Sequence, residues 1–313
     1  MPPAGLKLLK TGPLDLIIDT GRPGLRDRGV GPGGPADRWA FTLTNALAGN
    51  APETNAAALE FSLVGPTLLA GQTTGCALSG SVRSAQLHHA NGTTVQLAPW
   101  SSFTLQAGDR LRIGPVTGDL RGYLAIRGGI QSPSVAGSRQ SLIPLQAESL
   151  LPAGPGQLPS RHMDADWAGS PRPGGPLRVL PGPQWDQLGW PTGQNPEATV
   201  ADRVDRMGVR LNLTRPAPTP SAGLPSEPVC PGVIQAPSTA EWIILGVGCQ
   251  TLGGYAKVAQ VIEADLDRVG RLRPGDTLAL ERVGPADAVA ANREYRRRLA
   301  RCCQAALLTL SGH

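Results

Sequence analysis

The chain repeats several short segments at a nearly constant separation. The matched residues, in chain order, are Gly12 and Gly182, Glu60 and Glu227, and Gly108 and Gly275. The first pair is 170 positions apart and the other two are 167 apart. Gly-Asp turns are common, so one match is weak evidence, whereas a shared order and spacing is more specific. We therefore predict two domains related by internal duplication, with Gly108–Asp109 equivalent to Gly275–Asp276 and Glu60 equivalent to Glu227.

The segments between these anchors are short and bounded by glycine, proline or aspartate. Runs such as "TVQLAPW", "RLRIG" and "YLAIRG" are typical of β-strands. The 40 glycines and 31 prolines follow no fixed period, which excludes a collagen-like chain and favours many turns. Helices are expected at 36–50, where Ala40, Leu43 and Leu47 share a face, and at 263–272. We predict a mainly β fold with a few short helices, of the barrel or sandwich class.

Domain boundaries are predicted from shifts in composition. We expect an N-terminal β domain at 1–155, a Gly- and Pro-rich polar linker at 156–176, and a C-terminal β domain at 177–285. Residues 286–313 are expected to form a basic helix, since "NREYRRRLAR" holds five arginines and one glutamate. Such a helix can bind nucleic acid or acidic lipid, but a solvated face is the simpler interpretation. The residues expected to dock it on the body or on a partner are Tyr295, Leu299, Cys302 and Leu310.

Several function classes are excluded by composition and by missing motifs. Aromatic residues make up only 4% of the chain, which argues against a stacking platform for nucleic acid. No apolar run reaches the length of a membrane span and the N-terminus has no signal-peptide core, so we expect a cytoplasmic protein. Five cysteines without C-x-x-C spacing and four histidines predict neither disulfides nor a metal site. Nucleotide-binding and acyl-transfer motifs are absent, as is a biotin attachment segment, so no covalent biotin is expected.

A glycine-rich stretch, "DTGRPGLRDRGVGPGGPAD" (19–37), is the first candidate for ligand binding. Its glycines allow backbone N–H groups to converge on an anion, and arginines such as Arg22 bind carboxylate or phosphate. Asp19 and Asp37 are its acidic candidates. The alternative is an ordinary surface loop in which Asp37 caps the following helix. Arg206, in "DRMG" (205–208), is a second arginine beside a glycine.

A second candidate is "GCQTLGGYAKVAQV" (248–261). Gly253 and Gly254 permit positive φ and close approach of a ligand to the backbone. Lys257 offers a charge, and Tyr255, two positions earlier, lies on the same face of a strand. Gln250 is able to hydrogen-bond an amide or a carboxylate. The alternative is a glycine bulge followed by an exposed lysine.

These segments together resemble one family. "DTGRPGLRDRGVGPGGPADRWAFTLTNALAGN", "GYLAIRGGI", "LRVLPGPQ", "DRMGVRL", "PGVIQAP" and "QTLGGYAKVAQVI" are similar, in this order, to segments of the biotin-dependent carboxyltransferase-like family, also called allophanate hydrolase subunit 2. The family includes the C subunit of 5-oxoprolinase, KipA-like antagonists of a kinase inhibitor and the carboxyltransferase part of urea carboxylase. The resemblance implies two cyclophilin-like β-barrel domains and a partner resembling allophanate hydrolase subunit 1, which is KipI-like, with the active site near their interface.

The chain departs from the family pattern at three polar positions. A glutamine is replaced by Ile18, and an acid and an arginine that usually precede Gln250 are replaced by Gly248 and Cys249. These changes imply either a different substrate or reduced activity.

The function that the resemblance implies is that of the C subunit of an ATP-dependent 5-oxoprolinase-type complex. This protein is expected to be inactive alone and to act on 5-oxoproline or a related amide. ATP is the expected cofactor, with Mg²⁺ held by Asp19 or Asp37 as an open alternative. The catalytic candidates are Lys257, Tyr255, Gln250 and Arg206. The candidates for binding substrate or phosphate are Asp19, Arg22, Asp37, Arg139, Gln235, Gly253 and Gly254.

Two other functions stay open. The chain is alternatively a carboxyltransferase subunit that acts with a biotin carrier on another chain, as in urea carboxylase. It is otherwise a non-enzymatic, KipA-like protein that binds a kinase inhibitor. A LamB/YcsF-type neighbour would favour the 5-oxoprolinase function, and a biotin carboxylase neighbour would favour the carboxyltransferase. Neither nucleic acid nor a membrane is expected as a partner.

Overall fold

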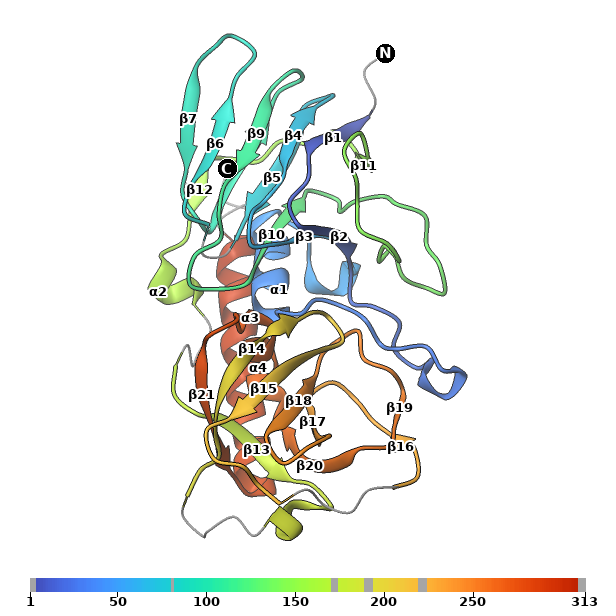
Figure 1. Ribbon diagram of the computed structural model, residues 1–313. Helices are drawn as coiled ribbons and strands as arrows, with labels where there is room; N and C mark the ends of the chain where they lie inside the picture. The colour runs from blue at the N-terminus through green and yellow to red at the C-terminus, as the bar shows by residue number, and fades with distance from the viewer. Residues whose placement is uncertain (1–3, 80–81, 170–173, 189–193, 219–223, 309–313) are drawn as a thin grey trace. The chain divides into compact units, whose positions relative to one another are not determined.

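The computed structural model describes residues 4–79, 82–169, 174–188, 194–218 and 224–308, and these fall into two compact units (Figure 1). Unit 1 consists of Met1–Gly21, Arg38–Ser170 and Arg298–His313, and unit 2 of Arg22–Asp37 and Pro171–Arg297. The units differ from the predicted linear division in two segments. The glycine-rich segment 22–37 belongs to unit 2, and the end of the C-terminal helix belongs to unit 1.

Unit 1 is built on two six-stranded antiparallel sheets. The first has the order β11 (Leu150–Pro152), β1 (Gly5–Lys10), β4 (Thr67–Ala70), β9 (Arg110–Ile113), β6 (Ala85–His88) and β7 (Thr94–Leu97). The second has the order β12 (Arg161–His162), β8 (Ser101–Leu105), β5 (Thr74–Leu78), β10 (Arg121–Ile126), β3 (Ala58–Ser62) and β2 (Leu14–Ile18). One cluster of buried residues, including Leu8 and Leu68 from the first sheet and Phe61 and Leu124 from the second, joins the two sheets.

Helix α1 (Arg38–Leu47) packs against β5 and β10 of unit 1. Its predicted apolar face is confirmed, because Ala40, Leu43 and Leu47 are all buried. The helix ends within the expected range 36–50, and Gly49, with φ of 76°, donates its N–H to the carbonyl of Ala46. The segment expected to be a linker contains β12 and the short helix α2 (Ala165–Ala168).

Unit 2 is a closed seven-stranded barrel. Its order is β13 (Leu177–Pro181), β20 (Ala256–Val261), β17 (Val233–Ala236), β18 (Glu241–Leu245), β15 (Gly208–Leu213), β14 (Glu197–Val204) and β21 (Thr277–Arg282), and β21 closes on β13 in parallel. Trp242, Ile234 and Val258 are fully or almost fully buried in its interior. A two-residue ribbon of β16 (Glu227–Pro228) and β19 (Leu252–Gly253) lies outside the barrel sheet (Figure 1).

The glycine-rich segment 22–37 is held to unit 2 by backbone and charged contacts. The N–H of Gly33 donates to the carbonyl of Val247 at 3.0 Å. The carboxylate of Asp37 pairs with Arg271 of α3 (Leu266–Arg271) at 2.5 Å. The segment therefore runs beside residues 246–249, which precede the second candidate stretch.

The two Gly-Asp turns of the predicted duplication have the same hydrogen bonds. The Asp109 carboxylate accepts from the N–H of Gln106, and the Asp276 carboxylate accepts from the N–H of Arg273, each at 2.8 Å. Gly108 and Gly275 have φ of 89° and 87°. Each turn also leads into a strand, β9 or β21, that pairs with its neighbour directly after the aspartate. The predicted equivalence of Gly108–Asp109 and Gly275–Asp276 therefore holds for these two turns.

The expected equivalence of Glu60 and Glu227 is wrong. Glu60 is buried in β3, where its carboxylate accepts from the hydroxyl of Tyr123 at 2.6 Å. Glu227 lies in the short ribbon outside the barrel, with half of its side chain exposed. The spacing of 167 matched these residues although their strands have different neighbours.

The basic C-terminal helix is confirmed as α4 (Pro285–Leu308). In unit 2 the buried Tyr295 donates its hydroxyl to Asp267, and in unit 1 Arg298 lies over the ring of Trp39 at 5.8 Å. Cys302 is buried as expected, while Leu310 lies outside the described residues. Within the described part of the chain, no helix is both long and apolar enough to cross a membrane.

Candidate functional site

Lys257 lies on the outer face of the barrel in unit 2. Its neighbours in β20, Ala256 and Val258, belong to the barrel core, so strand alternation directs the Lys257 side chain away from the interior. Lys257 is nevertheless only 7% exposed. The alternative of an exposed lysine after a glycine bulge is therefore wrong.

A glutamate covers Lys257. The Nζ of Lys257 lies 2.7 Å from Oε2 of Glu227 in β16. This glutamate entered the sequence analysis only as a repeat anchor, and no local signal links it to a lysine 30 residues later. Because half of the Glu227 side chain is exposed, water reaches one member of the ion pair and protein encloses the other.

Gln235 lies beside Lys257 on the same outer face. The two residues are register partners of β17 and β20, and Ile234 and Ala236, which flank Gln235, face the core. Gln235 is 1% exposed, and its Nε2 has no hydrogen-bond acceptor among the described residues. A buried amide donor without an acceptor is costly, so this atom marks a position where an external oxygen would be stabilised.

Gly253 packs directly against this glutamine, for a reason other than the one expected. Neither Gly253 nor Gly254 has positive φ. A Cβ at position 253 would instead lie 2.4 Å from Nε2 of Gln235 and 3.3 Å from Val229. The absence of a side chain at Gly253 therefore makes room for Gln235, and the predicted close approach is to a side chain.

Tyr255 and Gln250 lie at the surface near this cluster in sequence. Tyr255 is 53% exposed and precedes β20, whereas Lys257, two residues later, is buried. Gln250 is exposed in the turn before β19. Both side chains are thus open to solvent, and the buried polar groups of the cluster are those of Lys257 and Gln235, with the half-exposed Glu227 paired to the lysine.

Arg206 and segment 22–37 meet in unit 2. The guanidinium of Arg206 donates to the carbonyl of Gly34, and the carbonyl of Arg206 accepts the N–H of Gly248 at 2.7 Å. Arg22 is buried, and its N–H donates to the carbonyl of Pro32 at 2.6 Å. Asp37 is paired with Arg271. These residues connect loops to one another, and a phosphate-binding role is not needed to explain them.

Asp19 and Arg139 lie together in unit 1. The Asp19 carboxylate accepts from the N–H of Gly21 at 2.8 Å, the hydroxyl of Ser138 at 2.5 Å and the N–H of Arg139 at 2.7 Å. The Arg139 guanidinium donates to the carbonyl of Ser132. The buried Asp19 thus fixes a loop, and its oxygens already have donors.

The three positions that depart from the family pattern have structural explanations. Ile18 is fully buried in β2. A Cβ at Gly248 would lie 3.0 Å from the carbonyl oxygen of Arg206, which leaves little room for a side chain. Burial raises the pKa of the Cys249 thiol to about 11, although Arg26 lowers it, so the thiol is protonated near neutral pH. Cys249 therefore does not replace the missing charge.

A metal site does not fit the residues that were expected to hold Mg²⁺. Asp19 has three donors already, and Asp37 is paired with an arginine. Among the described residues there is no group of three or more His, Cys, Asp or Glu side chains that could hold a metal ion. We derive no step through Mg²⁺ bound to this chain.

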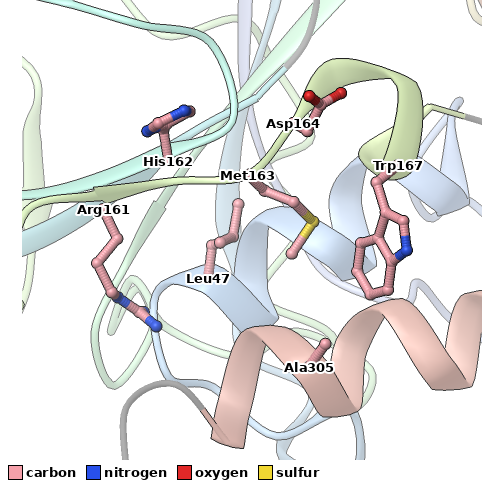
Figure 2. Close-up of a pocket in the computed structure, with 7 residues that line it drawn as sticks. All are labelled: Leu47, Arg161, His162, Met163, Asp164, Trp167 and Ala305. Atoms are coloured by element: carbon pink, nitrogen blue, oxygen red, sulfur yellow. The ribbon is translucent and has the colours of Figure 1, made fainter.

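Unit 1 contains a cavity of about 950 Å³ that the sequence analysis did not predict. It is lined by Leu47, Arg161, His162, Met163, Asp164, Trp167 and Ala305. Figure 2 shows the side chains of Leu47, Met163 and Trp167 between the strand segment and the part of α4 that carries Ala305. Burial lowers the pKa of the Arg161 guanidinium. The residues "RHMDADW" (161–167), which were expected to lie in a linker, were the available signal.

Comparison with known proteins identifies the family. The model of the carboxyltransferase domain, subdomains A and B, matches residues 28–282. The C subunit of 5-oxoprolinase from Escherichia coli (strain K12) is 30% identical over 308 residues, covering 93% of this chain and 96% of that protein. The protein of the same name from Haemophilus influenzae is 29% identical, covering 89% of this chain and 91% of that one.

A solved structure agrees with this match. The crystal structure of Kluyveromyces lactis urea carboxylase aligns with a TM-score of 0.81 and 26% identity, over 96% of this chain. This chain spans 29% of that longer protein. The resemblance to the family and the mainly β fold class are both confirmed. The chain therefore belongs to the carboxyltransferase domain family with subdomains A and B.

Proposed function

We propose that this chain is the C subunit of an ATP-dependent 5-oxoprolinase-type complex. The proposal is supported by the similarity to two proteins that are named as C subunits of 5-oxoprolinase, which extends over about nine tenths of both chains. A protein of this kind acts with other chains. We expect a KipI-like partner, a LamB/YcsF-type chain as a further partner and a cytoplasmic location.

The observation that carries the proposal is the pair of donors on adjacent strands of the barrel. Lys257 supplies a buried ammonium, and Gln235 supplies a buried amide N–H that has no acceptor within the described parts of the chain; the two residues are register partners. A 5-oxoproline molecule has a carboxylate and a lactam carbonyl oxygen, which are acceptors for such donors. Charge-assisted hydrogen bonds to a carboxylate are among the stronger contacts that a site can make.

The carboxylate and the lactam carbonyl oxygen of 5-oxoproline take different parts in the proposed reaction. A lactam carbonyl resists attack by water, and ATP supplies the phosphoryl group that activates its oxygen. Water then adds to the carbonyl carbon, the C–N bond breaks, and glutamate, ADP and phosphate are released. Lys257 holds the carboxylate and Gln235 orients the carbonyl oxygen, so both groups contribute by positioning and by stabilising negative charge.

The remaining candidates take smaller roles in this proposal. Tyr255 and Gln250 are exposed and are available to contact the substrate or the partner chain. Arg206 and Asp37 hold segment 22–37 against unit 2 and so shape the surroundings of the site. ATP is expected to be engaged by the assembled complex, and the single chain is expected to be inactive.

A second candidate is a carboxyltransferase that works with a biotin carrier on another chain. The similarity to K. lactis urea carboxylase favours it. Its substrate and its carboxyl donor both carry oxygen acceptors, which the same ammonium and amide would bind. The two candidates differ in their products, so an assay of products separates them.

The experiment is co-expression with the KipI-like and LamB/YcsF-type partners, co-purification and an ATPase assay. The assembled complex is expected to hydrolyse ATP in the presence of 5-oxoproline and to form glutamate, whereas each single chain is expected to do neither. Urea and 2-pyrrolidone are the comparison substrates. Carboxylation of urea by the complex when ATP, bicarbonate, a biotin carboxylase and its biotin carrier are added, with no glutamate formed from 5-oxoproline, would support the carboxyltransferase instead.

A further inference from the structure

Lys257 and Glu227 differ in how easily each is able to leave their ion pair. Lys257 is 7% exposed and is fixed in a barrel strand, whereas Glu227 lies in a two-residue strand whose partner is β19. Half of the Glu227 side chain already contacts water. When Glu227 rotates into solvent, its carboxylate is hydrated, so the move costs the glutamate little. Lys257 would then be left as a buried charge without an anion. Any anion that reaches Lys257 is stabilised by the same physical effect.

Gln235 offers a second donor beside Lys257, and this donor requires a hydrogen-bond acceptor on the ligand. Its Nε2 is buried and lacks an acceptor among the described residues, and it lies against Gly253 in the strand that pairs with Glu227. Glu227 supplies one carboxylate to Lys257, and none of the residues that the structure describes accepts from the amide of Gln235. The cluster is thus one acceptor short of complete, and a ligand with two acceptors would satisfy both donors.

We propose that Glu227 is an internal competitor, whose carboxylate occupies the position of a ligand carboxylate at Lys257. The ligands that the site admits are small carboxylates that also carry an amide carbonyl. The ligand carboxylate replaces that of Glu227 at Lys257, and the amide carbonyl oxygen accepts from Gln235. Anions without a carbonyl and amides without a carboxylate satisfy only one donor. This inference rests on the proposed function, because it describes how the same site selects 5-oxoproline.

The test is isothermal titration of the full chain with three probes. They are 5-oxoproline, N-acetylalanine, which is an open-chain amide with a carboxylate, and 2-pyrrolidone, which is a lactam without one. Glu227→Gln removes the competing charge and keeps the shape. We expect it to tighten both carboxylate probes about fivefold, the worth of an ion pair with one exposed partner, and to leave 2-pyrrolidone unchanged.

Glu241→Gln is the matched control, because Glu241 forms another partly exposed ion pair of the barrel, with Arg210. It is expected to leave all three affinities unchanged. Glu227→Asp, which draws the carboxylate back by one methylene, should tighten the carboxylate probes by an intermediate amount. Gln235→Leu should weaken both at least tenfold.

The inference is overturned if Glu227→Gln leaves the affinity for the carboxylate probes unchanged or lowers it, or if it raises the affinity for 2-pyrrolidone equally. It is also overturned if neither carboxylate probe binds the wild type or Glu227→Gln. Its failure is distinguishable from failure of the proposed function. Tighter N-acetylalanine binding by Glu227→Gln, without 5-oxoproline turnover in the complex, would support the inference and contradict the function. Turnover of 5-oxoproline by the complex, with affinities for the probes that Glu227→Gln leaves unchanged, would support the function and contradict the inference.

Discussion

Replacing Lys257 by methionine removes the charge of the candidate site and keeps its apolar stem. The stem is buried, so alanine would add the cost of a cavity to the loss of charge. Methionine leaves Glu227 without its partner, but that carboxylate is half exposed and regains water. We therefore expect the free energy of unfolding to change by about 1 kcal/mol or less, which corresponds to a change in Tm of about 2–4 °C.

The effect on activity is expected to be much larger. A charged contact to a substrate carboxylate or a developing oxyanion is worth about 2–4 kcal/mol inside a site that excludes water. Lys257→Met should therefore lower kcat/KM for 5-oxoproline in the assembled complex by roughly 30- to 1000-fold. The disproportion between stability and activity follows from the different exposure of the two members of the ion pair.

The assay compares the substituted complex with the wild type and with Lys7→Met. Lys7 is paired with Glu148 in unit 1, so this control removes a lysine from another Lys–Glu pair without touching the barrel. Thermal melting of each chain is measured alongside kcat/KM. The reasoning is refuted if Lys257→Met retains kcat/KM within threefold of the wild type, or if it lowers Tm by more than about 10 °C, since the lysine would then be structural.

Three further predictions concern other parts of the chain. Burial raises the pKa of the Asp15 carboxyl to about 6. Between pH 4 and 6 this carboxyl is ionised in the unfolded chain and protonated in the folded chain, so the free energy of unfolding falls as pH rises. Asp15→Asn should remove this dependence and stabilise the chain by up to about 3 kcal/mol at pH 7, measured by urea unfolding at pH 4 and 7; equal slopes against pH would contradict it. Gly253→Ala pushes its Cβ against Gln235 and should raise KM for 5-oxoproline about tenfold, and an unchanged KM would show that Gln235 is not a ligand contact. Ala305→Trp, which fills the cavity of unit 1, should leave kcat/KM within twofold, and a large loss would assign that cavity to the reaction.

Local features of the fold were predictable from the sequence. The buried face of α1 follows from its spacing of apolar residues. Each of the turns at Gly108 and Gly275 spans four residues, in which an aspartate side chain accepts a hydrogen bond from a backbone N–H three residues earlier. Such features depend on neighbours in the chain, so a short segment contains all the information that they need.

The site was predictable only in part, because its contacts join distant segments. Lys257 was named from its surroundings in sequence and Gln235 from the resemblance to the family. Glu227 was missed, since it reaches Lys257 through the β16–β19 ribbon. Asp37 and Arg271 are 234 positions apart, and no local pattern predicts their ion pair. Gly253 was chosen for the correct position and the wrong reason, because sequence does not distinguish a glycine needed for positive φ from one that leaves space for a buried side chain.

The central claim is tested most directly by measuring glutamate and ADP together in the reconstituted complex supplied with ATP and 5-oxoproline. The account predicts that the two products appear in equal amounts, that neither forms with this chain alone, and that Lys257→Met suppresses both to the same extent. Formation of no glutamate by the complex, while the same chains carboxylate urea when ATP, bicarbonate, a biotin carboxylase and a biotin carrier are supplied, would contradict it.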